Sequence, residues 1–162
     1  MEPGPQVTEA RPEREITLKS AETDEELSGY YELRRQVFVL EQGLFEGTDA
    51  DAHDAQAIPI VALRGGKVIG VVRCYPDRGG TWFGGRLAVH PDHRAGALGA
   101  RLVRRAVETV EARSDVRRFL AHVQSQNVGF FEWLGWMRLG EPFLLRGRKH
   151  QLMEWPLARR PS

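Results

Sequence analysis

Cysteine is almost absent from this sequence, and it has neither a long apolar run nor a strong net charge. The single cysteine, Cys74, excludes a disulfide within the chain and favours a reducing compartment, so we expect a cytoplasmic protein. No apolar run approaches the roughly 20 residues that cross a bilayer, which excludes a membrane-spanning helix. The formal net charge is only +1, so the total charge does not indicate nucleic-acid binding. We therefore expect neither a membrane nor a nucleic acid among its partners.

The composition is that of one ordinary globular domain. Hydrophobic residues make up 41% of the 162 residues and charged residues 28%, which allows a single folded core. Residues 1–14 are rich in proline and glutamate and lack the apolar segment of a secretory signal, so we expect a disordered leader. We place the single domain at residues 15–158 and a short tail at residues 159–162.

Charge is unevenly distributed along the chain. Between Glu41 and Asp54 there are five acidic residues and no lysine or arginine. Between Arg86 and Arg118 there are eight arginines and four acidic residues. Such segments are often only solvated faces of opposite sign. The functional alternative is an acidic lip that attracts a cationic acceptor and a basic segment that cradles an anion.

Hydrophobic periodicity predicts that the domain begins with a strand and a helix. Residues 15–20 alternate polar and apolar side chains, as a half-buried strand does. Thr23 and Glu26 form a capping-box pattern, and apolar residues at spacings of three and four predict a helix that ends near Gln42. The predicted apolar stripe of this helix consists of Leu27, Tyr30, Leu33, Val37 and Leu40.

The middle of the chain predicts three antiparallel strands. Residues 57–63 and 67–75 are β-branched runs separated by Arg64-Gly65-Gly66, which indicates a hairpin. Residues 81–89 form the next strand after a turn.

The remaining elements complete an α/β sandwich. A second helix has an apolar stripe from Leu98 to Val110. A buried strand follows at residues 118–123, and a short helix that Gly135 stops comes after it. The last strands are predicted at residues 136–139 and 143–155.

The segment from Arg86 to Ala100 contains the most informative motif. A strand runs into a glycine-bearing loop that opens directly into a helix. Such a loop presents consecutive backbone N–H groups, and the helix N-terminus adds about half a positive charge, so a pyrophosphate can bind there. Small side chains allow the phosphates to approach the backbone, and they occur at Ala95, Gly96, Ala97, Gly99 and Ala100.

This motif resembles the cofactor loop of the GNAT acetyltransferases, in which Leu-x-Val-x-Pro is followed by Arg-x-x-Gly-x-Gly/Ala. Ala97 stands where the family usually has its first glycine, and Gly96 lies one place earlier. The segment from Asn127 to Trp136 resembles the family's Asn-x-x-(x)-Phe-Tyr-x-x-x-Gly-Phe motif. The whole chain is also similar to an actinobacterial and cyanobacterial group of N-acetyltransferases. The residues that match the loop motif are Leu87, Val89, Pro91, Arg94 and Gly99.

The resemblance implies the GNAT fold, an α/β fold whose central, mixed but mostly antiparallel sheet of about seven strands is flanked by helices. It also implies acetyl-CoA as co-substrate, lying in a V between the strands at residues 81–89 and 118–123. The cofactor-binding residues that it implies are Leu87, Ala88, Val89, Arg94, Ala95, Gly96, Ala97, Leu98, Gly99, Ala100, Asn127 and Phe130.

A second resemblance concerns the acceptor end. The segment from Leu33 to Gln42, followed by several aspartates, looks like the GNAT branch that includes the acyl-homoserine-lactone synthases. In that branch an arginine, a phenylalanine, a glutamate and aspartates shape the substrate pocket. The resemblance therefore implies substrate-binding roles for Arg34, Phe38 and Asp54, with Asp51 as a further candidate, and a substrate-facing, catalytic role for Glu41.

The sequence leaves the general acid open. Phe131 stands where many relatives carry a tyrosine that protonates the departing thiolate, and phenylalanine cannot donate a proton. His122, on the strand beside the expected thioester, and His150, on the final strand, are the candidate catalytic residues. For His122, the alternative is a hydrogen-bonded core residue.

These observations predict transfer of an acetyl group from acetyl-CoA to a primary amine of a small molecule by direct attack. One alternative is a longer or carrier-bound acyl donor, as in the lactone synthases. Another is a non-catalytic CoA-binding sensor, which Phe131 and Ala97 favour. We expect no metal site, because His53 and its neighbouring aspartates match no known ligand spacing. We allow for a homodimer.

Overall fold

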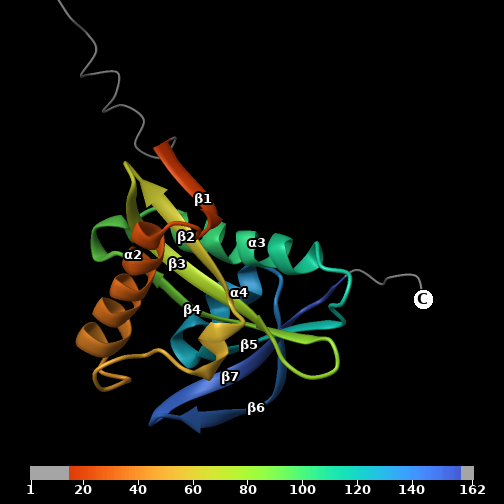
Figure 1. The fold of residues 1–162 in the computed structure, drawn as a ribbon. Coiled ribbons are helices and arrows are strands. Elements are labelled where there is room, and N and C mark those ends of the chain that lie inside the picture. Colours follow the sequence, from red (N-terminus) through yellow and green to blue (C-terminus); the bar gives the residue numbers. More distant parts are fainter. Residues whose placement is uncertain (1–14, 158–162) are drawn as a thin grey trace, which may run out of the picture.

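A computed structural model describes residues 15–157, whereas the expected leader at residues 1–14 and the tail at 159–162 lie outside the described residues. One seven-stranded sheet, in the order β1-β2-β3-β4-β5-β7-β6, forms the centre of the fold (Figure 1). Only the β4–β5 pair is parallel, which confirms the mixed, mostly antiparallel sheet that the sequence predicted. The strands are β1 (Ile16–Ser20), β2 (Ile58–Arg64), β3 (Lys67–Pro76), β4 (Thr81–Val89), β5 (Arg118–Gln124), β6 (Met137–Leu145) and β7 (Arg148–Trp155).

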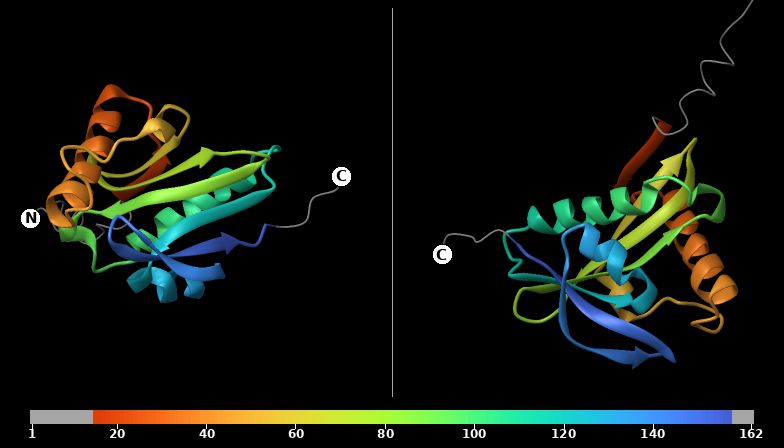
Figure 2. Two further views of the ribbon diagram at one scale, coloured as in Figure 1. Left: turned by 90° about the horizontal axis from the view of Figure 1, so that it is seen from below. Right: turned by 180° about the vertical axis from the view of Figure 1, so that it is seen from behind.

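Helices cover both faces of this sheet (Figures 1 and 2). Alternate residues of β2 show the two faces, because Ile60 packs in the core beneath α3 while Val61 packs against α2. Within residues 15–157 no helix is long and apolar enough to cross a bilayer. The helical elements are α2 (Asp24–Arg34), η2 (Arg35–Glu41), η3 (Ala52–Ala55), η4 (Pro91–His93), α3 (Leu98–Glu111), η5 (Ser125–Asn127) and α4 (Val128–Trp133).

The first helical segment differs from its prediction in its second half. The capping box at Thr23 and Glu26 is present, and the helical segment ends at Glu41, as the sequence indicated. From Arg35 onward, however, the backbone forms a π-helix. Its wider turn rotates later side chains relative to an α-helix, so that Phe38 is buried and Leu40, predicted in the apolar stripe, is 62% exposed. An α-helical period could not have predicted this rotation.

The last predicted strand is in fact a hairpin. Residues 143–155 were expected to form one strand, but β6 ends at Leu145 and β7 begins at Arg148. Arg146 and Gly147 connect them with φ angles of 53° and 76°. Two consecutive residues with positive φ form the tight turn that antiparallel strands favour, so an Arg-Gly pair was sufficient to reverse the chain.

A bulge in β4 lies where this strand separates from β5. Val71 pairs with Ala88 and Arg73 with Gly85, so β4 holds one more residue than β3 between the two pairs. Within this bulge Arg86 adopts a φ of 53°, which is uncommon for a non-glycine residue. β4 pairs with β5 only from Thr81 to Gly84, and beyond that point the two strands separate.

The π-helix can be tested with two identical substitutions in one helical segment. Leu33 is 3% exposed and Leu40 is 62% exposed. We expect Leu33→Ala to lower the free energy of unfolding by about 2–5 kcal/mol, because it leaves a cavity in the core. Leu40→Ala should change the same quantity by less than about 0.5 kcal/mol. Urea denaturation measures both, and equal losses would show that Leu40 is buried as the α-helical period predicts.

Candidate active site

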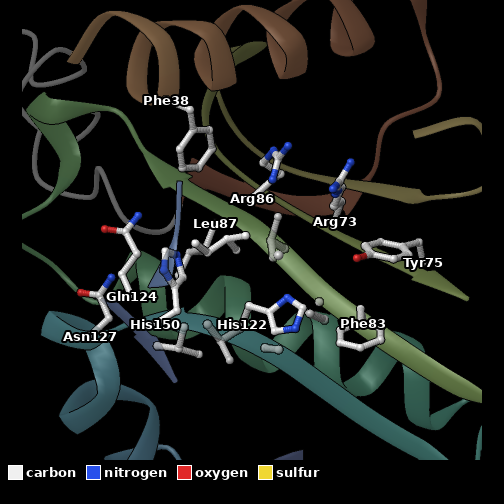
Figure 3. Close-up of a pocket in the computed structure, with 18 of the residues that line it drawn as sticks. Phe38, Arg73, Tyr75, Phe83, Arg86, Leu87, His122, Gln124, Asn127 and His150 are labelled. Atoms are coloured by element: carbon white, nitrogen blue, oxygen red, sulfur yellow. The ribbon is translucent and has the colours of Figure 1, made fainter. Parts of the chain in front are cut away.

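A cavity of about 400 Å³ lies where β4 and β5 separate. Its volume is within the range of small-molecule sites. Figure 3 shows His122 and His150 on one side of the cavity and Arg73 and Arg86 on the other, with Leu87 of β4 between them. Of the residues predicted for the site, this cavity is lined by Phe38, Asp51, Leu87, His122, Asn127 and His150.

The start of α3, at the end of the loop from β4, has no side-chain cap. Ala97 is the N-cap of α3 and makes no side-chain hydrogen bond to the helix, so the first N–H groups of α3 lack a side-chain partner. Ala95, Gly96 and Ala97 are exposed. With Leu98 they border a second recess of about 190 Å³ beside β1 and β2. The uncapped helix start and the small exposed residues before it fit a pyrophosphate of CoA.

The strand edge beside the cavity fits the extended arm of the same molecule. From Gly85 to Val89, β4 has no pairing with β5, so its backbone groups on that side are not used by the sheet. An extended ligand can bind to such an edge as an added strand does. Ala88 itself is buried and pairs with Val71, while the side chain of Leu87 reaches the cavity.

Glu41 and Arg94 form an ion pair that the sequence analysis did not anticipate. Arg94 Nη1 and Nη2 donate to the two carboxylate oxygens of Glu41 at 2.7 and 2.8 Å. Arg94 Nε donates to the carbonyl oxygen of Val89 at 2.8 Å. The hydrogen bonds from Arg94 lower the pKa of Glu41. Glu41 was predicted to face the acceptor, but it does not line the cavity and instead holds the arginine of the cofactor loop.

The acidic segment is not the free negative lip that its composition suggested. Its aspartates are paired with arginines from three other elements, in a group that we call the Arg–Asp cluster. Arg34 Nη1 and Nη2 donate to Asp54 at 2.7 and 3.0 Å, and Arg34 Nε donates to Asp49 at 2.8 Å. The cluster is formally neutral and consists of Arg34, Arg73, Arg86, Asp49, Asp51 and Asp54.

Three members of this cluster were predicted to bind the substrate. Asp51, the further candidate, lines the cavity, unlike Arg34 and Asp54. The structure places both behind the cavity lining, because Arg34 is fully buried and the side chain of Asp54 is only 9% exposed. Burial alone would raise the pKa of Asp54, but hydrogen bonds from Arg34, from the backbone of Asp51 and from Arg73 outweigh burial and hold the pKa well below its usual range. Both side chains therefore remain charged and engaged with each other.

The two candidate histidines differ in their surroundings. His150 is 7% exposed, and its Nδ1 lies 2.9 Å from the carbonyl oxygen of Arg148. Because a carbonyl oxygen only accepts, Nδ1 carries the proton, and Nε2 of the neutral ring is an acceptor. The ring of His122 lies between Phe83 and Phe143, at centroid distances of 5.2 and 5.5 Å. Burial by the cavity walls, and secondarily His150, lower the pKa of His122.

Several residues of the cavity were missed by the sequence analysis. Tyr75 stacks on His53 and Phe83, with ring centroids 4.0 and 5.8 Å apart, and continues the aromatic wall that reaches His122. Arg73 is 3% exposed, within an otherwise apolar buried strand. A charge at such a position requires a buried partner, and this was the signal in the sequence that could have identified it.

Two further observations concern metal binding and thiol chemistry. Within residues 15–157 no group of three or more histidine, cysteine or acidic side chains is arranged to hold a metal. Cys74 is buried, and burial raises the pKa of its thiol to about 12, so it is not an accessible thiolate nucleophile.

The fold, the cavity and the loop together match one family. The sequence model of the acetyltransferase (GNAT) family matches residues 21–136. The chain belongs to the GNAT acetyltransferase family. Family membership confirms the predicted enzyme class, an acyl-CoA-dependent acetyltransferase.

Relatives of this GNAT protein are distant in sequence and close in fold. A Bacillus subtilis (strain 168) protein described as a candidate acetyltransferase is 29% identical over 141 residues, which cover 85% of this chain and 95% of that protein. The crystal structure of Escherichia coli ElaA is similar with a TM-score of 0.79 at 19% identity, covering 87% of this chain and 99% of that one. A CoA-dependent acyl-homoserine lactone synthase, BjaI, is similar with a TM-score of 0.69 at 21% identity, covering 87% of this chain and 83% of that one. The second resemblance in the sequence is thus accompanied by a shared fold.

The role of Arg34 can be tested against its neighbour in the helix. Arg34 is fully buried, whereas Arg35 is exposed. We expect Arg34→Met to lower the free energy of unfolding by about 3–5 kcal/mol, because it leaves buried carboxylates without their partner. Arg35→Met should change it by less than about 0.5 kcal/mol. Guanidinium denaturation provides the comparison. A fully stable Arg34→Met protein that had lost only acceptor affinity would instead make Arg34 a direct substrate ligand.

Proposed function

We propose that this protein transfers an acetyl group from acetyl-CoA to a primary amine of a small molecule by direct attack. The observation that carries the proposal is the cavity at the divergence of β4 and β5, where β4 has a free strand edge, together with the uncapped start of α3 at the second recess. The small volume, about 400 Å³, supports a small acceptor.

Backbone groups bind the donor in this proposal. The first N–H groups of α3 hold the pyrophosphate, and the edge of β4 around Leu87 holds the pantetheine arm. When bound, acetyl-CoA supplies the acetyl group as a thioester. Donors along the edge of β4 polarise the carbonyl, since backbone N–H groups at a strand edge are fixed before the ligand arrives.

His122 acts as the general base that takes a proton from the acceptor's ammonium group before the amine attacks. Only a neutral amine has the electron pair needed for attack. The lowered pKa of His122 keeps its ring unprotonated near neutral pH, so it can accept a proton there. Its ring makes no hydrogen bond to any residue that the structure describes, and it lines the cavity.

His150 orients the acceptor side of the cavity. Its Nδ1–H is engaged with the backbone, so its remaining nitrogen is a fixed acceptor for a donor group of the substrate. Phe131 is buried against Trp136, with ring centroids 5.5 Å apart, and has no proton to give. The departing thiolate therefore takes its proton from water or from the amine itself.

A longer acyl donor is the second candidate. The inner end of the cavity is apolar and lies between α3 and β5, where Val103, Ala106 and Phe119 line it. This lining can accept an acyl chain longer than acetyl. Comparing acetyl-CoA with hexanoyl-CoA as donor distinguishes the two candidates by the higher kcat/KM.

The cofactor loop is tested with substitutions at Gly99. A Cβ there would lie 3.7 Å from the ring of Phe130, an ordinary contact, so a side chain can be added without disrupting the fold. We expect CoA to raise the Tm of the parent protein by mass action and to leave that of Gly99→Glu unchanged. The start of α3 favours a negative charge, so the fold tolerates the added carboxylate. The same carboxylate repels the phosphates of CoA.

Gly99→Gln is the matched control, because it adds the same volume without the charge. It should keep part of the CoA-induced shift in Tm. A flat response of the parent protein to millimolar CoA, in both the melting curve and calorimetric titration, would remove the basis of the proposed function.

The two histidines are separated by their effects on the pH profile. In the parent, kcat/KM should fall as the pH drops through the lowered pKa of His122, because protonation removes the base. His122→Asn should lower kcat by about a hundredfold or more and abolish this acid limb. His150→Asn should cost at most about tenfold in kcat and retain the limb, since it removes a positioning contact only.

Melting curves exclude unfolding as the cause in either variant. A His122→Asn protein that stays folded and keeps the parent's kcat and acid limb would show that His122 is not the base. Loss of the limb in His150→Asn alone would assign the base to His150.

A further inference from the structure

Two guanidinium groups are held together at the acceptor end of the cavity. The Cζ atoms of Arg86 and Arg146 lie 4.6 and 4.0 Å from the ring centroid of the same residue, Phe45. All three residues line the cavity. Arg86 comes from the bulge of β4 and Arg146 from the turn between β6 and β7, so the tertiary fold brings two distant cations to one aromatic ring.

Stacking on Phe45 leaves the donors of these arginines available. A guanidinium contacts an aromatic ring through its face, while its N–H bonds lie in its own plane and point outward. Arg146 makes no ion pair with any carboxylate among residues 15–157, and its guanidinium lies over the ring of Phe45. Arg86 donates from Nε and Nη2 to Asp49 and from Nη2 to Asp51, so its Nη1 has no hydrogen bond to a described residue.

Negative charge lies mainly on the opposite side of these arginines. Asp49, the main partner of Arg86, is 2% exposed and faces the protein interior. Asp51 is the one carboxylate among the described residues that line the cavity, and Arg73 already binds both of its oxygens, at 2.7 and 2.9 Å. The cavity is therefore cationic at its surface although the Arg–Asp cluster is neutral as a whole.

The environment of Arg86 shows the same excess of positive charge. Burial, and then the neighbouring charge of Arg73, lower the pKa of the Arg86 guanidinium even though Asp49 is bound to it. A second anion on the cavity side would compensate this repulsion. A second cation, such as an acceptor without an acid group, would add to it.

We propose that the acceptor is an amino acid, whose carboxylate binds between Arg86 and Arg146 while its amine faces His122. A carboxylate is small enough for the cavity and matches the paired N–H geometry of guanidinium groups. Figure 3 shows Arg86 on β4 across the cavity from His122 on β5, which places an anion site and a base on opposite sides of one acceptor. This assignment rests on the proposed function and names its substrate class.

Sets of three matched acceptors test the substrate class. Each set contains an amino acid, its carboxamide and the amine that lacks the acid group altogether, such as phenylalanine, phenylalaninamide and phenethylamine. With acetyl-CoA as donor, thiol release and product mass give kcat/KM for each compound. We expect at least a tenfold preference for the amino acid within a set, because only it has the anion.

The outcomes distinguish failure of the carboxylate site from failure of the proposed amine acetylation. Equal or better acetylation of the amides and amines would overturn the carboxylate site and leave the proposed amine acetylation intact. Acetylation of no acceptor by a protein that binds CoA would overturn the proposed function and this inference with it.

Arg146→Asn tests the site itself. Arg146 has a φ of 53°, a conformation that asparagine tolerates well, so the variant should fold. We expect its KM for the amino acid to rise about tenfold, with kcat and the KM for acetyl-CoA unchanged, and its preference over the amide to shrink by the same factor. The control is Lys149→Asn, which removes one charge from the same hairpin at a residue outside the cavity lining. An unchanged preference in Arg146→Asn, or an equal loss in Lys149→Asn, would overturn the assignment.

Discussion

The buried Arg–Asp cluster is the interaction on which the site depends. Through Arg34 it joins α2 to the acidic segment, and through Arg73 and Arg86 it joins that segment to β3 and β4. Buried ion pairs need not add stability over an apolar core, but loss of one partner is costly, so the cluster fixes these elements relative to one another. The bulge of β4 directs Arg86 into the cluster, and where this bulge begins β4 stops pairing with β5 and the cavity opens.

The cluster also decides the sign of the acceptor site. In the sequence the segment from Glu41 to Asp54 holds five acidic residues and no lysine or arginine, yet each of its aspartates is held by arginine and its first glutamate by Arg94. Asp49 and Asp54 are buried in the cluster, and both oxygens of Asp51 are bound by Arg73. The arginines therefore determine the charge of the cavity surface. The aspartates of an acidic segment thus hold in place the arginines that make the cavity surface positive.

In the proposed function, the cofactor and the acceptor are recognised by different means. The cofactor would be bound by backbone N–H groups at the start of α3 and along β4, so replacement of a family glycine by Ala97 leaves these donors in place. The acceptor end uses side chains that come from separate elements, among them His122, His150 and Arg146. A backbone site follows from the fold alone, whereas a side-chain site varies with the residues that the fold brings together.

By itself the sequence determined the family and the order of strands and helices, and it predicted the cofactor loop, because local periodicity and a contiguous motif carry that information. It correctly placed His122 and His150 at the cavity, since both lie on predicted strands beside it. Only the tertiary structure decided the partners of Arg34, Asp54 and Glu41, the π-helix that buries Phe38 and the meeting of Arg86 with Arg146 on Phe45. These depend on pairings between residues far apart in the chain, and charge pairing of that kind leaves no periodic trace in a single sequence.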